Sequence, residues 1–257
     1  MSLKYCLLAT EGPNDQAAIG RLLQLSGFKK FDGTRKDLNP FWEGFIPIYP
    51  KGGNLYTRMD MPSILTSSTH SVAIHWGEGD KLIQNITAIM TNHKRYAQEI
   101  HAFGLIVDAD EKQPDVLVKE KAQALKSFFP AMPEKAGDIT TSNPRTGIYV
   151  LPDNKRSGVL DSVLVDCASI AYPDHKNGAL RFLNDLDSRH TNRLNAGARN
   201  KAVVGCIANI IQPGQSNTSS IAQNEWISEQ TIKNGDLALL QQFLKNLWNC
   251  HKNKCRV

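Results

Sequence analysis

Short apolar runs, each followed by a stretch with the helical 3.6-residue period, organise the first two thirds of the chain. The apolar runs predict strands at residues 3–9, 71–76, 103–111 and 146–154. The periodic stretches predict helices at about 14–27, 81–100 and 115–129, and one more that is opened by Gly158. Strands that alternate with helices form βα units with right-handed crossovers. We therefore expect an α/β fold with a mainly parallel sheet flanked by helices.

Two segments depart from this alternation. Residues 28–68 are rich in Pro, Gly and aromatic residues, which predicts an inserted loop region with one hairpin around the KGGN stretch at 51–54. After Ala171 the pattern is helical but less regular, and no Pro/Gly/Ser linker separates this part from the sheet. We therefore predict an α/β core over residues 1–170 and a C-terminal helical layer over residues 171–257 that packs on it.

Composition narrows the class of protein. A chain of 257 residues with 41% hydrophobic residues can bury a substantial core. It contains no apolar run of about 18 residues, as a membrane span requires, and its start reaches a glutamate too soon for a secretory signal. We therefore expect a cytoplasmic protein. The net charge of +5 permits a polyanionic partner without requiring one, and five cysteines, an odd number, predict no disulfide framework.

Acidic residues stand where the predicted strands end. Glu11 follows the first strand, Asp108 and Asp110 close the third, and Asp153 ends the fourth. Ligands of parallel α/β sheets bind beyond the carboxyl ends of the strands, so we expect these acids at one rim. In extended backbone, residues two apart point the same way. Asp108 and Asp110 should therefore share a face while Ala109 turns inward.

Carboxylates in this arrangement suit a hard cation. Close carboxylates raise one another's pKa unless a positive charge lies between them, and a magnesium ion with oxygen ligands is the usual solution. The acids at the rim, with Asp15 one helical turn further on, supply enough oxygens for one magnesium or manganese ion or for two. A structural interpretation stands beside this one. Asp at strand ends also forms turns and helix caps, and we interpret Asp153 as a turn residue.

Two motifs give the chain a resemblance to a known family. The stretch TEGPND, ending at Asp15, resembles the EG-x-x-D signature of TOPRIM domains, and IVDADE resembles their D-x-D motif. TOPRIM domains are the metal-binding modules of topoisomerases, bacterial primases and OLD-type nucleases. The stretches PDNKRSGVLDS and NKAVVGC extend the resemblance to a prokaryotic TOPRIM-like family over most of the chain. Thr10 departs from the pattern, which usually has an apolar residue before the glutamate.

The resemblance implies roles where residues match. Glu11 matches the TOPRIM glutamate, a metal ligand or acid/base, and Asp108 and Asp110 match the metal ligands of the D-x-D motif. Asp15 matches an additional acidic position of OLD-like nucleases. Asp161 lies where related proteins tend to keep an acid, which implies a second-metal ligand. An aspartate in the first turn of a helix is an equally good structural interpretation of Asp161.

Basic side chains near the metals would stabilise the charge that phosphate oxygens accumulate during displacement. Lys155 and Arg156 follow the fourth strand and are candidates for phosphate contact. Lys201 resembles the distal lysine of OLD-type nucleases, which implies a catalytic role. The basic stretch SRHTNRLNAGARNK, which includes Arg193 and Arg199, is suited to track a nucleic-acid backbone. The alternative for each of these residues is a solvated surface charge.

Three functions fit these observations to different degrees. The first is a magnesium-dependent nuclease or related phosphodiester-cleaving enzyme that acts on nucleic acid. The second is a non-catalytic TOPRIM-like module that binds nucleic acid or a nucleotide, or is one subunit of a larger complex. A phosphatase of the haloacid dehalogenase type fits least, because its D-x-D pair normally ends the first strand and is followed by a later acidic pair that this chain lacks.

A partner protein is a further expectation from the resemblance. OLD-type proteins fuse their TOPRIM part to an ATPase, and this chain has no G-x-x-x-x-G-K-[ST] loop. An ATPase would therefore have to come from a second protein, as in a two-protein assembly that defends against phage. The sequence leaves the oligomeric state open.

Overall fold

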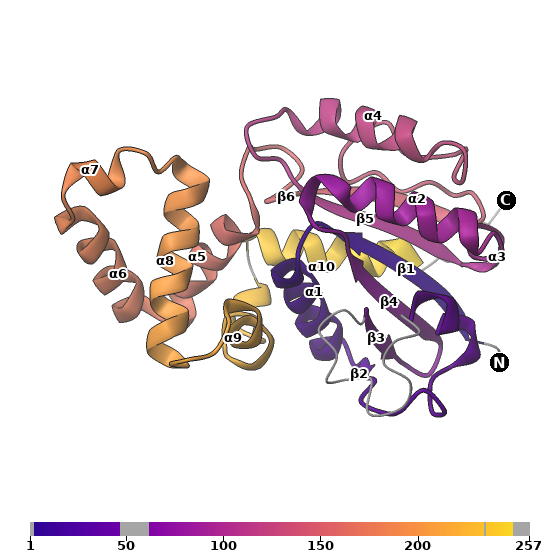
Figure 1. The fold of residues 1–257 in the computed structure, drawn as a ribbon, viewed down its shortest axis with the longest axis horizontal. Helices are drawn as coiled ribbons and strands as arrows, with labels where there is room; N and C mark the ends of the chain where they lie inside the picture. The colour runs from indigo at the N-terminus through magenta and orange to yellow at the C-terminus, as the bar shows by residue number, and fades with distance from the viewer. Residues whose placement is uncertain (1–2, 47–61, 234, 249–257) are drawn as a thin grey trace, which may run out of the picture.

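A six-stranded mixed sheet forms the centre of the protein (Figure 1). The computed structural model describes residues 3–46, 62–233 and 235–248. The strand order is β2-β3-β4-β1-β5-β6. The four parallel strands are β1 (Lys4–Thr10), β4 (His70–Trp76), β5 (Ala102–Asp108) and β6 (Arg145–Leu151). Two antiparallel strands, β3 (Ser63–Thr66) and β2 (Lys29–Lys30), complete one edge.

The parallel strands end together at one edge of the sheet. Thr10 at the end of β1 lies opposite Trp76 of β4 and Ile106 of β5. Asp108 at the end of β5 lies opposite Leu151 at the end of β6. The ends of β1 and β6 lead to α1 and α5, on the side of the helices at the left of Figure 1. The loops after the four strands are therefore neighbours in space.

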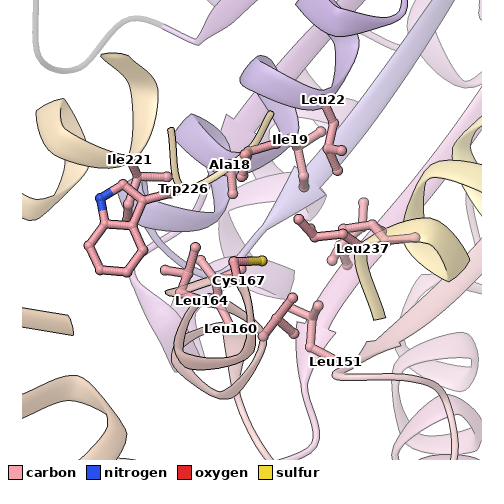
Figure 2. Close-up of a cluster of buried hydrophobic side chains, with 14 of the residues drawn as sticks. Ala18, Ile19, Leu22, Leu151, Leu160, Leu164, Cys167, Ile221, Trp226 and Leu237 are labelled. Carbon is pink, nitrogen blue, oxygen red and sulfur yellow. The ribbon is translucent and has the colours of Figure 1, made fainter. Parts of the chain in front are cut away.

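One face of the sheet is covered by α1 (Pro13–Leu25), α5 (Leu160–Ala171) and α10 (Gly235–Trp248). Alternate residues of β1, such as Cys6 and Leu8, are buried against this layer. Figure 2 shows how the apolar side chains of these helices meet, with Ile221 and Trp226 closing the cluster beside α1 and α5. The indole Nε1 of Trp226 donates to Ser220 Oγ at 3.0 Å, so its polar atom is satisfied inside the core.

The other face is covered by α2 (Leu82–Asn92), α3 (Arg95–Glu99), α4 (Pro114–Leu125) and the 3-10 helix η1 (Pro40–Phe45). Leu7 and Ala9 of β1 point into this second core. Aromatic rings of η1 and α3 form much of it, and Trp42 Nε1 donates to Ser71 Oγ at 2.9 Å. The sheet is therefore the middle of three layers.

The remaining helices are α6 (Pro173–Asp185), α7 (Ser188–Thr191), α8 (Ala196–Ile211) and α9 (Asn217–Gln223), with short 3-10 turns η3 (Gly79–Lys81) and η4 (Thr231–Lys233). Helices α5 to α8 form a lobe beside the sheet (Figure 1). Helix α9 joins this lobe to the core because it packs against both α1 and α8. Thr218 of α9 donates to Asn14 Oδ1 of α1 at 2.7 Å.

The last helix, α10, packs directly on the sheet. Gly104 and Gly147 lie beneath it, and a Cβ at either position would come within 3 Å of α10 side chains. Arg145 at the start of β6 donates to the carbonyl oxygens of Leu247 and Asn246, both at 2.9 Å. The two glycines and this arginine therefore fix α10 against β5 and β6.

The fold class predicted from the sequence, a mainly parallel α/β sheet flanked by helices, is confirmed. The predicted helix over residues 81–100 is wrong in one respect, because it breaks into α2 and α3 around His93. The predicted hairpin at 51–54 lies outside the described residues, while β2 and β3 show that the inserted region adds strands to the sheet. Among the helices of the described ranges, none combines the length and apolar character needed to cross a membrane.

Candidate functional site

Glu11 begins the loop after β1 and lies at the carboxyl edge of the sheet. Its carbonyl oxygen accepts from Gly79 N at 2.9 Å, which ties this loop to the one after β4. The backbone of Asp108 on the neighbouring strand opposes the rise in the pKa of Glu11 that burial causes. Because β1 pairs with β5, Glu11 lies beside the end of β5, where the D-x-D motif lies.

Asp108 is the last residue of β5, and its side chain is held in place from α5. Its Oδ1 accepts from Leu160 N at 2.9 Å, so the carboxylate caps the first turn of that helix. One oxygen of Asp108 is therefore used to position α5. The carboxylate also lies close enough to other acids to feel their charge.

The D-x-D motif is not extended throughout, which corrects one expectation. The strand ends at Asp108, because Asp110 adopts a left-handed conformation with φ of 50°. Its N–H and C=O pair with the C=O and N–H of Gly158, both at 2.9 Å, and form an isolated bridge. The prediction that the two aspartates share one face of a strand is therefore wrong. Ala109 is buried, as predicted, and Asp110 is exposed.

Two further acids lie in the first turns of helices. Asp15 is buried in α1, and its Oδ2 accepts from Gly12 N at 2.7 Å, so it caps the start of this helix. Asp161 is buried in the first turn of α5. Helix α1 follows β1 and helix α5 follows β6, so both acids lie at the same edge of the sheet.

These residues form one electrostatic group, which we name the acid cluster: Glu11, Asp15, Asp108, Asp110 and Asp161. Burial raises the pKa of Asp108, and the negative charges of Asp15 and Glu11 raise it further. Burial likewise raises the pKa of Asp15, with added repulsion from Glu11 and Asp161. Burial also raises the pKa values of Glu11 and Asp161. The folded chain therefore binds protons, or another cation, at this edge more readily than separate carboxylates would.

Two lysines bring positive charge to the acid cluster. Burial raises the pKa values of Asp15 and Asp161, and the positive charge of Lys201 on α8 opposes both rises. Its position follows from a contact one residue earlier, where Asn200 Nδ2 donates to Ser162 Oγ at 3.1 Å. The structure therefore brings this predicted residue to the cluster, while its catalytic role stays a prediction.

The second lysine, Lys121 of α4, was missed by the sequence reasoning. Its charge opposes the rise in the pKa of Glu11 that burial causes, more than any other group does. Asp80 after β4 was missed too, and its negative charge raises the pKa of Glu11 slightly. A signal for Lys121 was present in the sequence, because it lies four residues from Leu117 and from Leu125, both core residues.

Arg156 and Asp153 pair with each other and are not part of the acid cluster. The sequence had placed Asp153 at the same rim as the acids. Asp153 accepts from the backbone N–H groups of Lys155 and Arg156 at 3.0 and 2.8 Å, so it is the turn residue of our interpretation. Arg156 forms ion pairs with Asp153 at 2.8 Å and with Asp236 of α10 at 2.9 Å. Its guanidinium therefore has two carboxylate partners, and its predicted contact with phosphate stays a prediction.

The other predicted phosphate contacts lie on the surface or hold the lobe together. Lys155 and Arg193 are exposed. Arg199 donates to Asn184 Oδ1 and thereby links α8 to α6. Over the described ranges, no hydrogen bond or ion pair connects these three side chains to the acid cluster. Their role in nucleic-acid binding stays a prediction.

The acid cluster offers the type of ligand atom that a hard divalent cation prefers, but it does not form a complete metal site. All five side chains of the acid cluster offer carboxylate oxygens, the ligand type that magnesium and manganese prefer. Within the described residues, no group of three or more His, Cys, Asp or Glu side chains is arranged to hold a metal ion. Magnesium usually takes one or two carboxylates and completes its shell with water and substrate phosphate. Two neighbouring carboxylates of the acid cluster are enough for that mode.

Comparisons with known proteins place the chain in a family and support its fold. A family model described as "Protein of unknown function (DUF3226)" matches residues 5–249. Among the curated proteins, no sequence matches this chain. The crystal structure of a hypothetical protein from Pyrococcus horikoshii OT3 is similar over 95% of both chains, with a TM-score of 0.54 and 16% sequence identity. At this identity the likeness supports the fold alone.

Proposed function

We propose that this chain, which belongs to the DUF3226 family, is a magnesium-dependent nuclease or a related phosphodiester-cleaving enzyme. The observation that carries the proposal is the parallel pairing of β1 with β5. Glu11 follows β1 and Asp108 ends β5, so this pairing brings the glutamate and the aspartate motif to one edge of a parallel sheet. This is the part of an α/β sheet where ligands bind.

Charge balance supports a cation at this edge. The acid cluster has five carboxylates, and the charges of Lys112, Lys121 and Lys201 interact with them. Two negative charges therefore lack a lysine partner in the fully ionised cluster. Burying like charges together is costly unless they bind protons or a metal ion. A divalent cation supplies the missing charge.

The residues of the chain have separable tasks in this proposal. A bound magnesium ion would contribute positive charge toward the phosphate oxygens and lower the pKa of a bound water. Burial raises the pKa of Glu11, which makes this carboxylate a stronger base toward a proton of the attacking water. Asp108, fixed by Leu160 N, presents its second oxygen in a constant direction. Lys201 stabilises negative charge on the phosphate that accumulates during displacement.

The resemblance of the EG-x-x-D and D-x-D motifs to TOPRIM domains is part of this proposal. It supports nucleic acid as the substrate class and predicts a partner ATPase, since OLD-type proteins carry one. A two-protein assembly in phage defence is the biological setting that we propose on this basis. Co-purification of the chain with the product of an adjacent ATPase gene would test that part separately.

Metal-dependent cleavage by matched variants tests the proposal. Labelled single- and double-stranded DNA and RNA would be incubated with the wild-type chain, Glu11→Gln and Asp108→Asn, in magnesium, in manganese and in EDTA. Both variants should lose at least about a hundredfold in cleavage rate, because each removes a charge that acts on the reacting phosphate. Glu99→Gln is the control, an exposed acid before β5 at the opposite edge of the sheet, and it should cleave like the wild type.

The second candidate is a module that binds nucleic acid or a nucleotide without cutting it. The observation that favours it is the arrangement of the carboxylates, since no three of them in the described part of the chain are placed to hold a metal. Wild-type protein that binds nucleic acid, combined with no metal-dependent cleavage that Glu11→Gln or Asp108→Asn alters, would establish this function and refute the nuclease.

A further inference from the structure

The loop that joins β6 to α5, residues 152–159, holds both aspartates of the D-x-D motif. Gly158 in this loop exchanges two backbone hydrogen bonds with Asp110, each at 2.9 Å. Directly after the loop, Leu160 N donates to Asp108 Oδ1 at 2.9 Å. The place of this loop therefore determines where the two aspartates lie.

The start of the loop is a compact turn on the end of β6. Asn154, with φ of 67°, donates its N–H to Val150 O and accepts from Val150 N through its Oδ1, both at 2.8 Å. The carboxylate of Asp153 accepts from two backbone N–H groups of the same turn. The turn therefore fixes residues 153–156 and leaves the Arg156 side chain to make contacts outside it.

Arg156 connects this turn to α10. Its Nε donates to Asp153 Oδ2 at 2.8 Å, and its Nη2 donates to both carboxylate oxygens of Asp236, at 3.0 and 2.9 Å. We name these contacts the Arg156 bridge. An isolated ion pair in water contributes little. Here the Asp153 and Asp236 side chains are only 13% and 11% exposed, and one planar guanidinium donates three hydrogen bonds to them, which fixes their geometry.

Helix α10 is a firm attachment point for the bridge. Asp236 is in its first turn, and the helix packs on β5 and β6 (Figure 1). A Cβ at Gly104 of β5 or Gly147 of β6 would come within 3 Å of α10 side chains, so this contact is close. The Arg156 bridge therefore ties the loop to a helix that is fixed against the strand ending in Asp108.

We propose that Arg156 is a positioning residue of the acidic edge: through Asp153 and Asp236 it holds the β6–α5 loop, and this loop holds Asp108 and Asp110. The inference rests on the proposed function, because it treats the two aspartates as groups that act on the substrate. It gives Arg156 a task that differs from the phosphate contact predicted from the sequence.

Amide hydrogen exchange, followed by NMR, measures how often the loop opens. In Arg156→Met the amides of Asp110, Gly158 and Leu160 should exchange about tenfold faster than in the wild type, whereas the amides of the central strand β1 keep their rates. Asp236→Ala removes only the partner on α10 and should give a similar acceleration. The double variant should exchange no faster than Arg156→Met alone, because both changes remove the same bridge.

A matched control comes from the same helix. Lys245 is an exposed cation near the other end of α10 and donates to Gln241 Oε1 at 2.9 Å. Lys245→Met should keep all wild-type exchange rates and the wild-type cleavage rate. Arg156→Lys keeps the charge but lacks the planar fork, so its exchange rates should lie between those of the wild type and Arg156→Met.

Cleavage kinetics separate positioning from phosphate contact. In the nuclease assay described above, Arg156→Met and Asp236→Ala should each lower kcat about tenfold and leave KM nearly unchanged, because the aspartates are misplaced while the substrate contacts remain. If Arg156 bound phosphate instead, Arg156→Met would raise KM, and Asp236→Ala, which frees the guanidinium, would not lower kcat.

The outcomes that overturn the inference are distinct from those that overturn the proposed function. Wild-type exchange at Asp110, Gly158 and Leu160 in Arg156→Met would overturn the inference and leave the proposed function standing. Equal acceleration at these amides and in β1 would do the same, because the bridge would then support only overall stability. Local acceleration with unchanged kcat would also refute the positioning role. A wild-type chain that cleaves no nucleic acid in any metal would refute the proposed function, and the role of Arg156 in the reaction with it.

Discussion

Replacing Asp108 with asparagine should flatten the pH dependence of stability in the metal-free protein. Burial raises the pKa of Asp108 from 3.8 to about 8, and repulsion from Asp15 and Glu11 adds to the effect. The unfolded chain loses this proton near pH 3.8, whereas the folded chain keeps it to about pH 8. Between these values the folded state holds more protons, so the free energy of unfolding falls as pH rises. The stabilisation is complete below pH 3.8 and is lost as pH rises through about 8.

The magnitude follows from the number of protons. One extra bound proton changes the free energy of unfolding by about 1.4 kcal/mol per pH unit, so Asp108 alone accounts for about 3 kcal/mol between about pH 5 and pH 7. Asparagine does not titrate, and its Oδ1 can still accept from Leu160 N. The variant should therefore lose this part of the slope while it keeps the cap of α5.

Urea unfolding in EDTA at several pH values from about 5 to 7, followed by tryptophan fluorescence, measures both slopes. Burial lowers the pKa values of His70, His75 and His101, which acts in the opposite direction below pH 6.5. All three are present in both proteins, so the difference between wild type and variant isolates Asp108. Asp108→Ala should share the reduced slope but be about 1–3 kcal/mol less stable than Asp108→Asn, because Leu160 N loses its acceptor. Identical slopes for wild type and Asp108→Asn would refute the reasoning.

Three more predictions concern the core and the cation. Gly104→Ala should lower the free energy of unfolding by about 1–3 kcal/mol, because the new Cβ would lie 2.7 Å from side-chain atoms of two leucines; urea unfolding measures the loss. Ser71→Ala removes the acceptor of the buried Trp42 N–H, 2.9 Å away, and should cost about 1–3 kcal/mol in the same assay, whereas a change under a few tenths would contradict it. Magnesium at about 100 times its dissociation constant should raise the free energy of unfolding of the wild type by about 2.7 kcal/mol. Glu11→Gln should show a clearly smaller increase, and equal increases in thermal or urea unfolding would exclude Glu11 as a ligand.

The sequence predicted the strands well because each strand of a buried parallel sheet is a short apolar run. It also predicted which acids meet, since the carboxyl ends of parallel strands share one edge and the order of βα units determines which loops lie there. Glu11 and Asp108 are neighbours for this reason. Resemblance to a family added Asp161 and Lys201, which the strand pattern alone does not bring to the site.

Other features depend on tertiary contacts that no local pattern encodes. Arg156 has the spacing of a phosphate ligand, but its partner Asp236 lies 80 residues later in the chain. Asp110 follows an apolar strand and was expected to continue it, but the bridge to Gly158 turns the backbone into the left-handed region. Lys121 was overlooked because a lysine in a helix is usually assigned to the solvated face, although its spacing from two leucines placed it on the other side.

The packing of α10 on β5 and β6 has a consequence for biosynthesis. The strands and the acidic edge are encoded before residue 162, but the helix that closes one face of the sheet is the last described element, Gly235–Trp248. Side chains of this helix pack over Gly104 and Gly147, and Arg145 donates to carbonyl groups near the end of the helix. While the ribosome still holds this segment, the nascent chain exposes an uncovered apolar surface. This face of the sheet can therefore close only after α10 has left the ribosome, and a chaperone that shields nascent apolar surfaces should bind the intermediate rather than the folded protein.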